Sequence, residues 1–302
     1  MSQSNIGVFS FRTGAVRLPD LGYALCSLDR FAEDEFPHTA VFEWDAGTWR
    51  HGPLSQLQWV ADSACIAKFP KEQLVASGPS GRVIVMGQGE MFEEDIYSAG
   101  VPPDREGWIR EVREIAGLVY AVGMGRQAFR RENAKQWIRI DAGLTPGGEG
   151  MEGLESIHGF SGDDIYAVGW GGEIWHFDGR RWRSIASPTN LLLSRVLCAG
   201  DDQVYACGQA GVLLRGREDH WEIIEQDDTE EDFWDLEWFE DRLYLSTMKF
   251  LYTLEDSHLH LVEFEQEIPN TCYHLSKTHD VLWSFGAKDI MAFDGLDWTR
   301  IE

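Results

Sequence analysis

The 302-residue sequence predicts an all-β protein, a seven-bladed β-propeller of four-stranded antiparallel blades. Three observations lead to this prediction. A short apolar and aromatic segment recurs along the chain, an aromatic marker follows most copies, and the runs alternate apolar and polar residues with a period of two. No stretch of helical periodicity accompanies them. Because the repeats use the whole chain, residues 1–302 are expected to form a single propeller domain.

The recurring segment is clearest at Asp164–Gly169, which reads DIYAVG, and at Val204–Gly208, which reads VYACG. The positions equivalent to Gly169 are 26, 78, 123, 169, 208, 247 and 286, at intervals of 52, 45, 46, 39, 39 and 39 residues. Three equal intervals argue against chance. The longer early intervals indicate insertions in the first half of the chain.

The second marker is a ring residue that falls 12 to 14 positions after most anchors, and later in the first copy. Its members are Trp49, Phe92, Trp137, Trp182, Trp221, His260 and Trp298. A unit of about 39 residues with four short runs separated by Gly and Asp is typical of one four-stranded sheet. In the fourth unit we predict strands at 154–160, 165–170, 173–177 and 181–185. Residues 6–11 fit either the inner strand of the first blade or a pairing with the last blade.

These units resemble the propeller superfamily that includes WD40, YVTN, kelch and Asp-box proteins. The run from Tyr166 to Gly169, followed by Asp178-Gly179 and Trp182, is most similar to YVTN and Asp-box repeats. The sequence departs from the WD40 and Asp-box patterns. The chain lacks the Gly-His and Trp-Asp pairs of WD40 repeats, and Asp178-Gly179 follows Phe rather than Ser. The resemblance implies the fold and carries no particular activity.

Composition limits the partners. The 51 Asp and Glu against 26 Lys and Arg give a net charge of -25, which disfavours nucleic acid and anionic membranes as main partners. The 13 Trp and 43% hydrophobic residues suffice for a large core. Five cysteines without C-x-x-C spacing are expected to be buried free thiols. The N-terminus resembles no signal peptide and no apolar run reaches membrane-spanning length, so we expect a cytoplasmic protein.

The residues that could carry chemistry have simpler structural explanations. His258 and His260 share one strand face, where His260 replaces the outer-strand Trp. The pairs Asp163-Asp164 and Asp201-Asp202 precede second strands, as turn residues do. The Gly-rich segment 147–153 lacks the lysine and helix of a phosphate-binding loop. The sequence therefore predicts no catalytic set, no metal site and no cofactor. No arginine cluster is placed to grip a carboxylate substrate in the channel.

The up-and-down order of four strands sorts the loops onto two faces. We call the face with the inter-blade links and the turns between second and third strands the link face, and the other the opposite face. Residues 222–241 hold eleven acidic side chains in twenty and contain a link. An acidic insertion at 30–37, and links near 103–106 and 147–152, belong to the same face. The candidate partner-binding residues are Glu33, Asp34, Glu35, Asp227, Asp228, Glu230, Glu231, Asp232 and Trp234, the last near the channel mouth.

The basic residues are predicted to lie elsewhere. They fall in or near hairpins between third and fourth strands, towards the opposite face: Arg126, Arg130, Arg131, Lys135, Arg180, Arg181, Arg183, Arg215 and Arg217. A polarised molecule with one strongly acidic face is expected. Such a face would speed association with a basic partner and make that association sensitive to salt.

The leading functional hypothesis is a non-catalytic propeller whose acidic face engages a basic protein partner. One concrete form is a bacterial antitoxin or immunity protein that occludes a basic toxin; a scaffold or assembly factor fits nearly as well. The alternative hypothesis is a hydrolase or lyase acting on a glycan at the channel mouth, with paired carboxylates as acid and base. A third is a propeller used only for oligomerisation.

Overall fold

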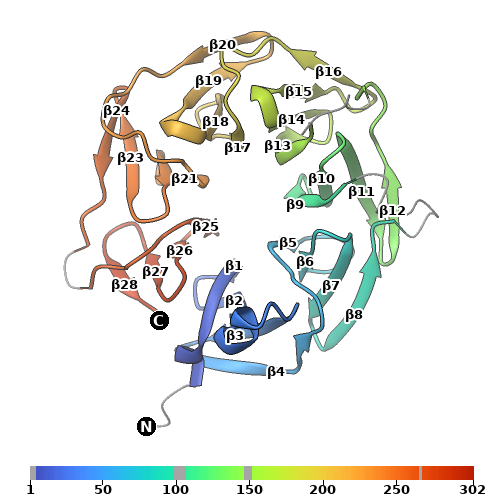
Figure 1. The fold of residues 1–302 in the computed structure, drawn as a ribbon, viewed down its shortest axis with the longest axis vertical. Helices are drawn as coiled ribbons and strands as arrows, with labels where there is room; N and C mark the ends of the chain where they lie inside the picture. Colours follow the sequence, from blue (N-terminus) through green and yellow to red (C-terminus); the bar gives the residue numbers. More distant parts are fainter. Residues whose placement is uncertain (1–4, 98–106, 146–151, 265–266) are drawn as a thin grey trace.

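Seven sheets of four antiparallel strands stand around a central axis in the computed structural model, which describes residues 5–97, 107–145, 152–264 and 267–302 (Figure 1). Within those ranges each sheet pairs four consecutive strands in chain order. The predicted seven-bladed propeller and its all-β class are confirmed.

The first strand of each blade lines the axis, as Figure 1 shows. These inner strands are β1 (Phe9–Leu18), β5 (Ser63–Ala67), β9 (Ile109–Ile115), β13 (Leu154–Ser161), β17 (Leu193–Cys198), β21 (Asp235–Phe239) and β25 (His274–Lys277). The second strands are β2 (Leu21–Leu28), β6 (Gln73–Ser77), β10 (Leu118–Gly123), β14 (Asp164–Gly169), β18 (Val204–Gly208), β22 (Arg242–Ser246) and β26 (Leu282–Phe285).

The third and fourth strands complete each sheet towards the rim. The third strands are β3 (Thr39–Asp45), β7 (Arg82–Gly87), β11 (Gln127–Asn133), β15 (Ile174–Phe177), β19 (Leu213–Arg217), β23 (Leu251–Glu255) and β27 (Ile290–Phe293). The outer strands are β4 (Thr48–Leu57), β8 (Glu90–Asp95), β12 (Gln136–Arg139), β16 (Trp182–Ile185), β20 (His220–Ile223), β24 (His258–Leu261) and β28 (Trp298–Arg300). The fourth blade matches its predicted strands closely, and the ring marker falls on the outer strand of every blade.

Helical structure is minor in the described part of the chain. The acidic insertion of the first blade begins with a short helix, α1 (Asp29–Glu33), that the sequence pattern did not predict. Single 3-10 turns occur at η1 (Asn5–Val8), η3 (Trp170–Gly172) and η4 (Gln209–Gly211). Among the described residues, no helix has the length and apolar character needed to cross a membrane.

The repeated glycine ends the second strand because the incoming link crosses it closely. A Cβ at Gly169 would lie 1.9 Å from the carbonyl oxygen of Gly153, and one at Gly208 would lie 1.9 Å from that of Leu192. A Cβ at Gly286 would meet the carbonyl of Thr271 at 2.0 Å. Such distances are far inside van der Waals contact, so a side chain there would displace the link. The anchor of the sequence repeat is therefore the point where each blade meets the link that enters it.

The hydrophobic core lies between neighbouring sheets rather than in the channel. Between the fourth and fifth blades, for example, Tyr166 and Ile174 pack with Leu193, Val204 and other buried residues. All five cysteines are buried and free, as predicted. Burial raises the pKa of the Cys272 thiol to about 12, which leaves it unreactive at neutral pH.

The ring closes by contacts between complete blades. β1 is the inner strand of the first blade, which resolves the two alternatives for residues 6–11. The Phe11 amide donates to the Ala287 carbonyl at 2.8 Å, and the Tyr273 hydroxyl donates to the Phe11 carbonyl at 3.0 Å. At the rim, the Trp49 indole donates to the Glu302 carboxylate at 3.0 Å. Phe9, Phe11, Trp283 and other core residues seal the same junction.

Candidate functional site

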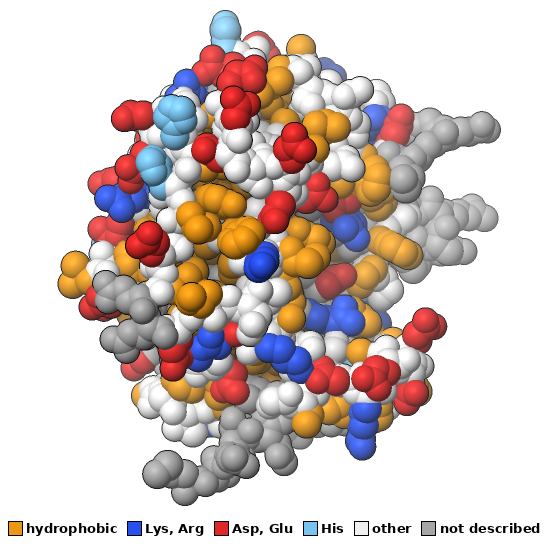
Figure 2. Space-filling view, turned by 60° about the vertical axis from the view of Figure 1, so that its left-hand side comes forward, with side chains coloured by type: hydrophobic (Ala, Val, Ile, Leu, Met, Phe, Trp, Pro, Cys, Tyr) orange, Lys and Arg blue, Asp and Glu red, His pale blue; other side chains and the backbone are white. Residues whose placement is uncertain are grey.

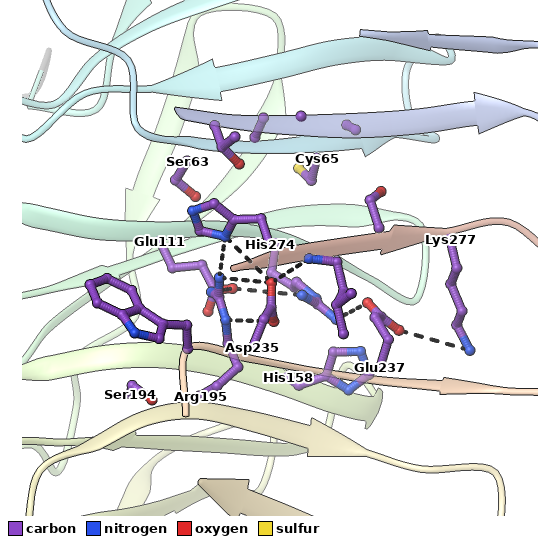
Figure 3. A pocket seen from close by; sticks show the side chains of 18 of the residues that line it. Ser63, Cys65, Glu111, His158, Ser194, Arg195, Asp235, Glu237, His274 and Lys277 are labelled. Carbon is purple, nitrogen blue, oxygen red and sulfur yellow. Dashed lines mark hydrogen bonds and ion pairs between the residues drawn. The ribbon is translucent and has the colours of Figure 1, made fainter. Parts of the chain in front are cut away.

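A cavity of about 700 Å³ occupies the central channel and is lined from all seven inner strands (Figure 3). Leu192, Gln209 and Asp232 line it at the link face, and Thr278 and His279 line it at the opposite face. The cavity therefore runs the length of the channel.

Polar side chains on several inner strands accept hydrogen bonds from backbone amides of the next blade. An inner strand has a paired neighbour on one side only, so its remaining amides need other acceptors. Side chains of the preceding inner strand supply them at Val112 (Ser63 Oγ, 2.9 Å), Ile157 (Glu111 Oε2, 2.7 Å), Val196 (Ser156 Oγ, 3.1 Å) and Leu275 (Asp235 Oδ2, 3.0 Å). Polar residues in otherwise apolar inner strands are thus structural in origin.

Arg195 of β17 contacts acids of two other blades at the cavity wall. One guanidinium nitrogen donates to Glu111 Oε1 at 2.6 Å, and another donates to Asp235 Oδ2 at 3.3 Å. Its Nε stands 2.8 Å from Asp235 Oδ1 without hydrogen-bond geometry, so that contact is electrostatic. His274 lies 3.5 Å from the same carboxylate. Figure 3 shows these four side chains converging from separate strands.

Asp235 is ionised in this network. Its burial alone would raise the pKa, but the charge of Arg195 and the bond to His274 outweigh burial and lower the pKa to about 2. A second group lies beside it, where Arg113 pairs with Glu237 at 2.8 Å and stands 3.7 Å from Glu111. Arginines thus line the channel, but acids of the protein hold them, so they are not free to grip a carboxylate substrate. In the sequence, these channel arginines could have been recognised as arginines inside short inner strands, as in Leu193-Ser194-Arg195-Val196.

Asp62, directly before β5, lines the cavity but, unlike Glu111, Asp235 and Glu237, has no arginine partner in the described chain. It makes no ion pair with any residue that the structure describes, although it lines the cavity and is partly buried. Burial raises its pKa to about 6, against the charges of Arg110 and Arg12, which lower it.

Replacing Asp62 with Asn is expected to stabilise the fold above neutral pH. A carboxyl whose pKa rises from 3.8 to about 6 on folding destabilises the ionised folded state by up to about 3 kcal/mol. The penalty is absent below about pH 4 and complete above about pH 7, so the gain should appear over that interval. Denaturant unfolding at pH 4 and pH 8 measures it, with Asp202→Asn as an exposed control. Equal gains at both pH values would contradict this assignment.

The glycan-hydrolase alternative gains a cavity, but arginines hold four of the carboxylates that line it. Glu111, Asp235 and Glu237 are held by arginines, and Glu155 pairs with Arg110 at 2.7 Å. These acids stabilise the ring and are not left to act on a substrate as acid and base.

The predicted partner-binding acids lie where their strand order predicts. The first group follows β2 in the insertion of the first blade, and the second group lies in the link from β20 to β21. All eight are exposed, and none forms an ion pair with a described residue: Glu33, Asp34, Glu35, Asp227, Asp228, Glu230, Glu231 and Asp232. Asp228 accepts from the Leu259 amide at 2.9 Å, and Asp232 accepts from the Ala210 amide at 2.8 Å.

Both groups share the link face without forming one patch, because the sixth and seventh blades separate them around the ring (Figure 1). Trp234 lies at the cavity mouth, as predicted, with 44% of its surface exposed and its ring 6.4 Å from that of Tyr273. Residues 103–106 and 147–151, predicted for the same face, lie outside the described residues. Glu152 is described and pairs with Arg126 at 3.1 Å.

The prediction of a single acidic face is wrong. Exposed acids without an ion pair to a described residue also stand on the opposite face, at the turns holding Asp20, Asp202 and Asp241. The repeated turn acids that precede second strands account for them. Figure 2, with the sixth blade brought forward, shows acidic side chains spread over the surface and hydrophobic groups between them.

The predicted cation placement is mostly confirmed. Lys135, Arg180, Arg181 and Arg183 are exposed at or beside hairpins between third and fourth strands. Arg126 is an exception, because it lies in the turn between β10 and β11 on the link face. Arg131 is another, since it is buried against Glu94.

Exposed apolar side chains, which the sequence analysis did not use, favour the link face. Trp108 is 63% exposed, Phe36 is 59% and Ile268 is 75%. The others on loops of this face are Val8, Trp234 and Met248. On the opposite face the large exposed hydrophobics of the described chain are Leu18, Phe69 and Leu296. Exposed aromatic residues among polar neighbours are typical of protein-binding surfaces.

Comparisons with known structures confirm the fold. YCF48 bound to D1 peptide superimposes with a TM-score of 0.67 at 14% identity, covering 95% of this chain and 92% of that one. The WD40 propeller domain of Doa1 gives a TM-score of 0.67 at 10% identity, covering 97% and 92%. At such identities the likeness concerns the fold alone.

Comparisons of sequence identify the family. No protein-family model matches the chain. Immune protein Tsi7 of Pseudomonas aeruginosa is 47% identical over 299 residues, which cover 98% of each protein. With that identity over nearly the whole length, the chain belongs to the family of the immune protein Tsi7, and immunity proteins are of a non-catalytic type, as the sequence predicted.

Proposed function

We propose that this protein binds and neutralises a cognate toxin in the cytoplasm, and that its link face contacts a basic surface of that toxin. The observation that carries the proposal is the relationship to an immune protein over 98% of both chains. An immunity protein acts by binding its toxin, so the remaining question is which surface does so.

Charge supports the link face. Its eight candidate acids are exposed and form no ion pair within the described chain, so they are available to a partner. On or near the opposite face there are both acids without an ion pair to a described residue, such as Asp202, and paired ones, such as Glu90 with Lys71 at 2.5 Å and Glu222 with Arg215 at 2.5 Å. An uncompensated acidic surface on a protein of net charge -25 attracts a basic partner from a distance.

Apolar anchors support the same face. Charged rims mainly set the rate of encounter, whereas buried aromatic side chains supply most of the affinity of protein interfaces. Trp234 stands two residues after Asp232, the end of the acidic run, and Phe36 directly follows Glu33, Asp34 and Glu35. Each acidic group therefore has an exposed aromatic residue beside it.

Neutralising the five acids of the β20–β21 link tests the role of charge. The variant changes Asp227, Asp228 and Asp232 to Asn, and Glu230 and Glu231 to Gln. We expect the association rate constant with purified cognate toxin to fall about 10- to 100-fold at low salt, and its salt dependence to flatten. Stopped-flow or surface-plasmon measurements at several salt concentrations provide the comparison.

The matched control removes five exposed acids from the opposite face of the same two blades, and thus the same total charge. These are Asp202, Glu218, Glu240, Asp241 and Asp256. It should change the rate much less. Equal losses in the two variants would mean that only bulk charge matters, and an unchanged rate in the link variant would refute the proposed contact surface.

A further inference from the structure

Charge along the cavity changes sign from one end to the other. At the link end the lining carboxylates are Asp62, Glu155 and Asp232, with Arg110 as the lining cation. At the opposite end Arg17, Lys68 and Lys277 line the cavity with Glu114. The negative end therefore opens towards the face that carries the exposed aromatic residues.

Asp62 lies at this negative end, partly buried and without a paired cation among the described residues. Arg110 lies in its neighbourhood but pairs with Glu155 at 2.7 Å. The other charged groups that act on Asp62 are Arg12 of β1, which favours its ionised form, and Glu155 of β13, which opposes it. A half-buried carboxylate without a paired cation is costly when ionised, and a cation delivered to it from outside would remove that cost.

Aromatic rings line the same mouth. Trp170 holds its indole in place by donating to Glu155 Oε1 at 2.5 Å, and Trp234 is partly exposed. Both line the cavity with Asp62. Indole faces attract ammonium and guanidinium groups, particularly where water is partly excluded.

We propose that the link end of the cavity receives a lysine or arginine side chain of the toxin, and that Asp62 is its acceptor. This inference rests on the proposed function and adds a specificity residue to it. A side chain fits these features better than a metal ion. Among the described residues, no group of three or more His, Cys, Asp or Glu is arranged to hold a metal. The cavity, at about 700 Å³, is also far larger than one ion needs.

The test is the pH dependence of toxin binding in the full-length protein and in Asp62→Asn. With a free pKa of about 6, Asp62 must lose a proton to accept a cation at pH 5, which weakens wild-type binding about tenfold relative to pH 7.5. Asp62→Asn should bind about tenfold more weakly than wild type at pH 7.5. It should approach wild type at pH 5. Titration calorimetry with purified cognate toxin measures both, and Asp202→Asn, on the opposite face, should keep the wild-type profile.

The outcomes separate the inference from the function. If the wild-type protein did not bind the toxin under any condition, the proposed function itself would be overturned. Wild-type binding with an identical pH profile and affinity in Asp62→Asn would overturn the role of Asp62 and leave the function intact. Because Asp62→Asn is expected to be more stable than wild type above neutral pH, weakened binding there does not reflect misfolding. Thermal unfolding of each variant verifies this.

Discussion

Asp235→Asn is expected to lower the free energy of unfolding by about 3–5 kcal/mol at pH 7. Asp235 is 2% exposed and joins three blades, since its carboxylate pairs with Arg195 of β17 and accepts the Leu275 amide of β25. An amide keeps the size of the side chain but removes the charge. Arg195 would then retain Glu111 as its paired acid at 2.6 Å.

The pH profile gives this prediction a direction. Since folding lowers the pKa of Asp235 to about 2, its stabilising contribution is complete above about pH 4 and is lost as the pH falls towards 2. The difference between wild type and Asp235→Asn should therefore become smaller in acid. Urea unfolding between pH 2.5 and 7 measures the difference, with exposed Glu231→Gln as a control of little effect. A constant difference at every pH would show that charge is not the cause.

Glu94→Gln is expected to cost a similar amount, about 3–5 kcal/mol, through a different contact. Glu94 of the second blade and Arg131 of the third form a bidentate pair at 2.6 and 2.9 Å, with side chains 0% and 1% exposed. The same carboxylate accepts the Lys135 amide at 2.7 Å and the Trp137 indole at 3.0 Å. Glutamine would turn an NH₂ group towards these donors and leave the buried guanidinium unpaired.

The adjacent residue supplies the control. Glu93 pairs with Arg82 at 2.6 Å, but both side chains are nearly half exposed, so Glu93→Gln should cost less than about 1 kcal/mol. Unfolding in guanidinium chloride measures the loss of stability in each variant. Losses of equal size would contradict the claim that the buried Glu94–Arg131 pair stabilises the contact between these two blades.

The repeat made the fold predictable because its signal is local. The anchor glycine and the outer-strand ring residue recur in most blades, and each marks a contact within a blade or with its own link. The sorting of loops onto two faces followed from strand order alone, so the positions of Asp227 and Glu33 could be predicted without coordinates.

The cavity could not be predicted in the same way, because equivalent inner-strand positions carry different residues. Related places hold hydroxyl, carboxylate and guanidinium groups in different blades: Ser63, Glu111, Ser156, Arg195 and Asp235. They share one role, which is to accept a hydrogen bond from a neighbouring blade or to form an ion pair with it. That role becomes visible only in the closed ring, where strands such as β9, β17 and β21 lie together. The acids of the opposite face were misjudged for a simpler reason: turn residues were read as structural and were left out of the charge balance.

Hydrogen–deuterium exchange of the protein with and without its cognate toxin tests the central claim most directly. The account predicts that toxin slows amide exchange on the link face, in residues 29–36 and 225–234 and at the cavity mouth around Asp62. Exchange at the turns that hold Asp20, Asp202 and Asp241 should be unchanged. Protection confined to those opposite-face turns, with the link segments exchanging as in the free protein, would contradict the claim that the link face binds the toxin.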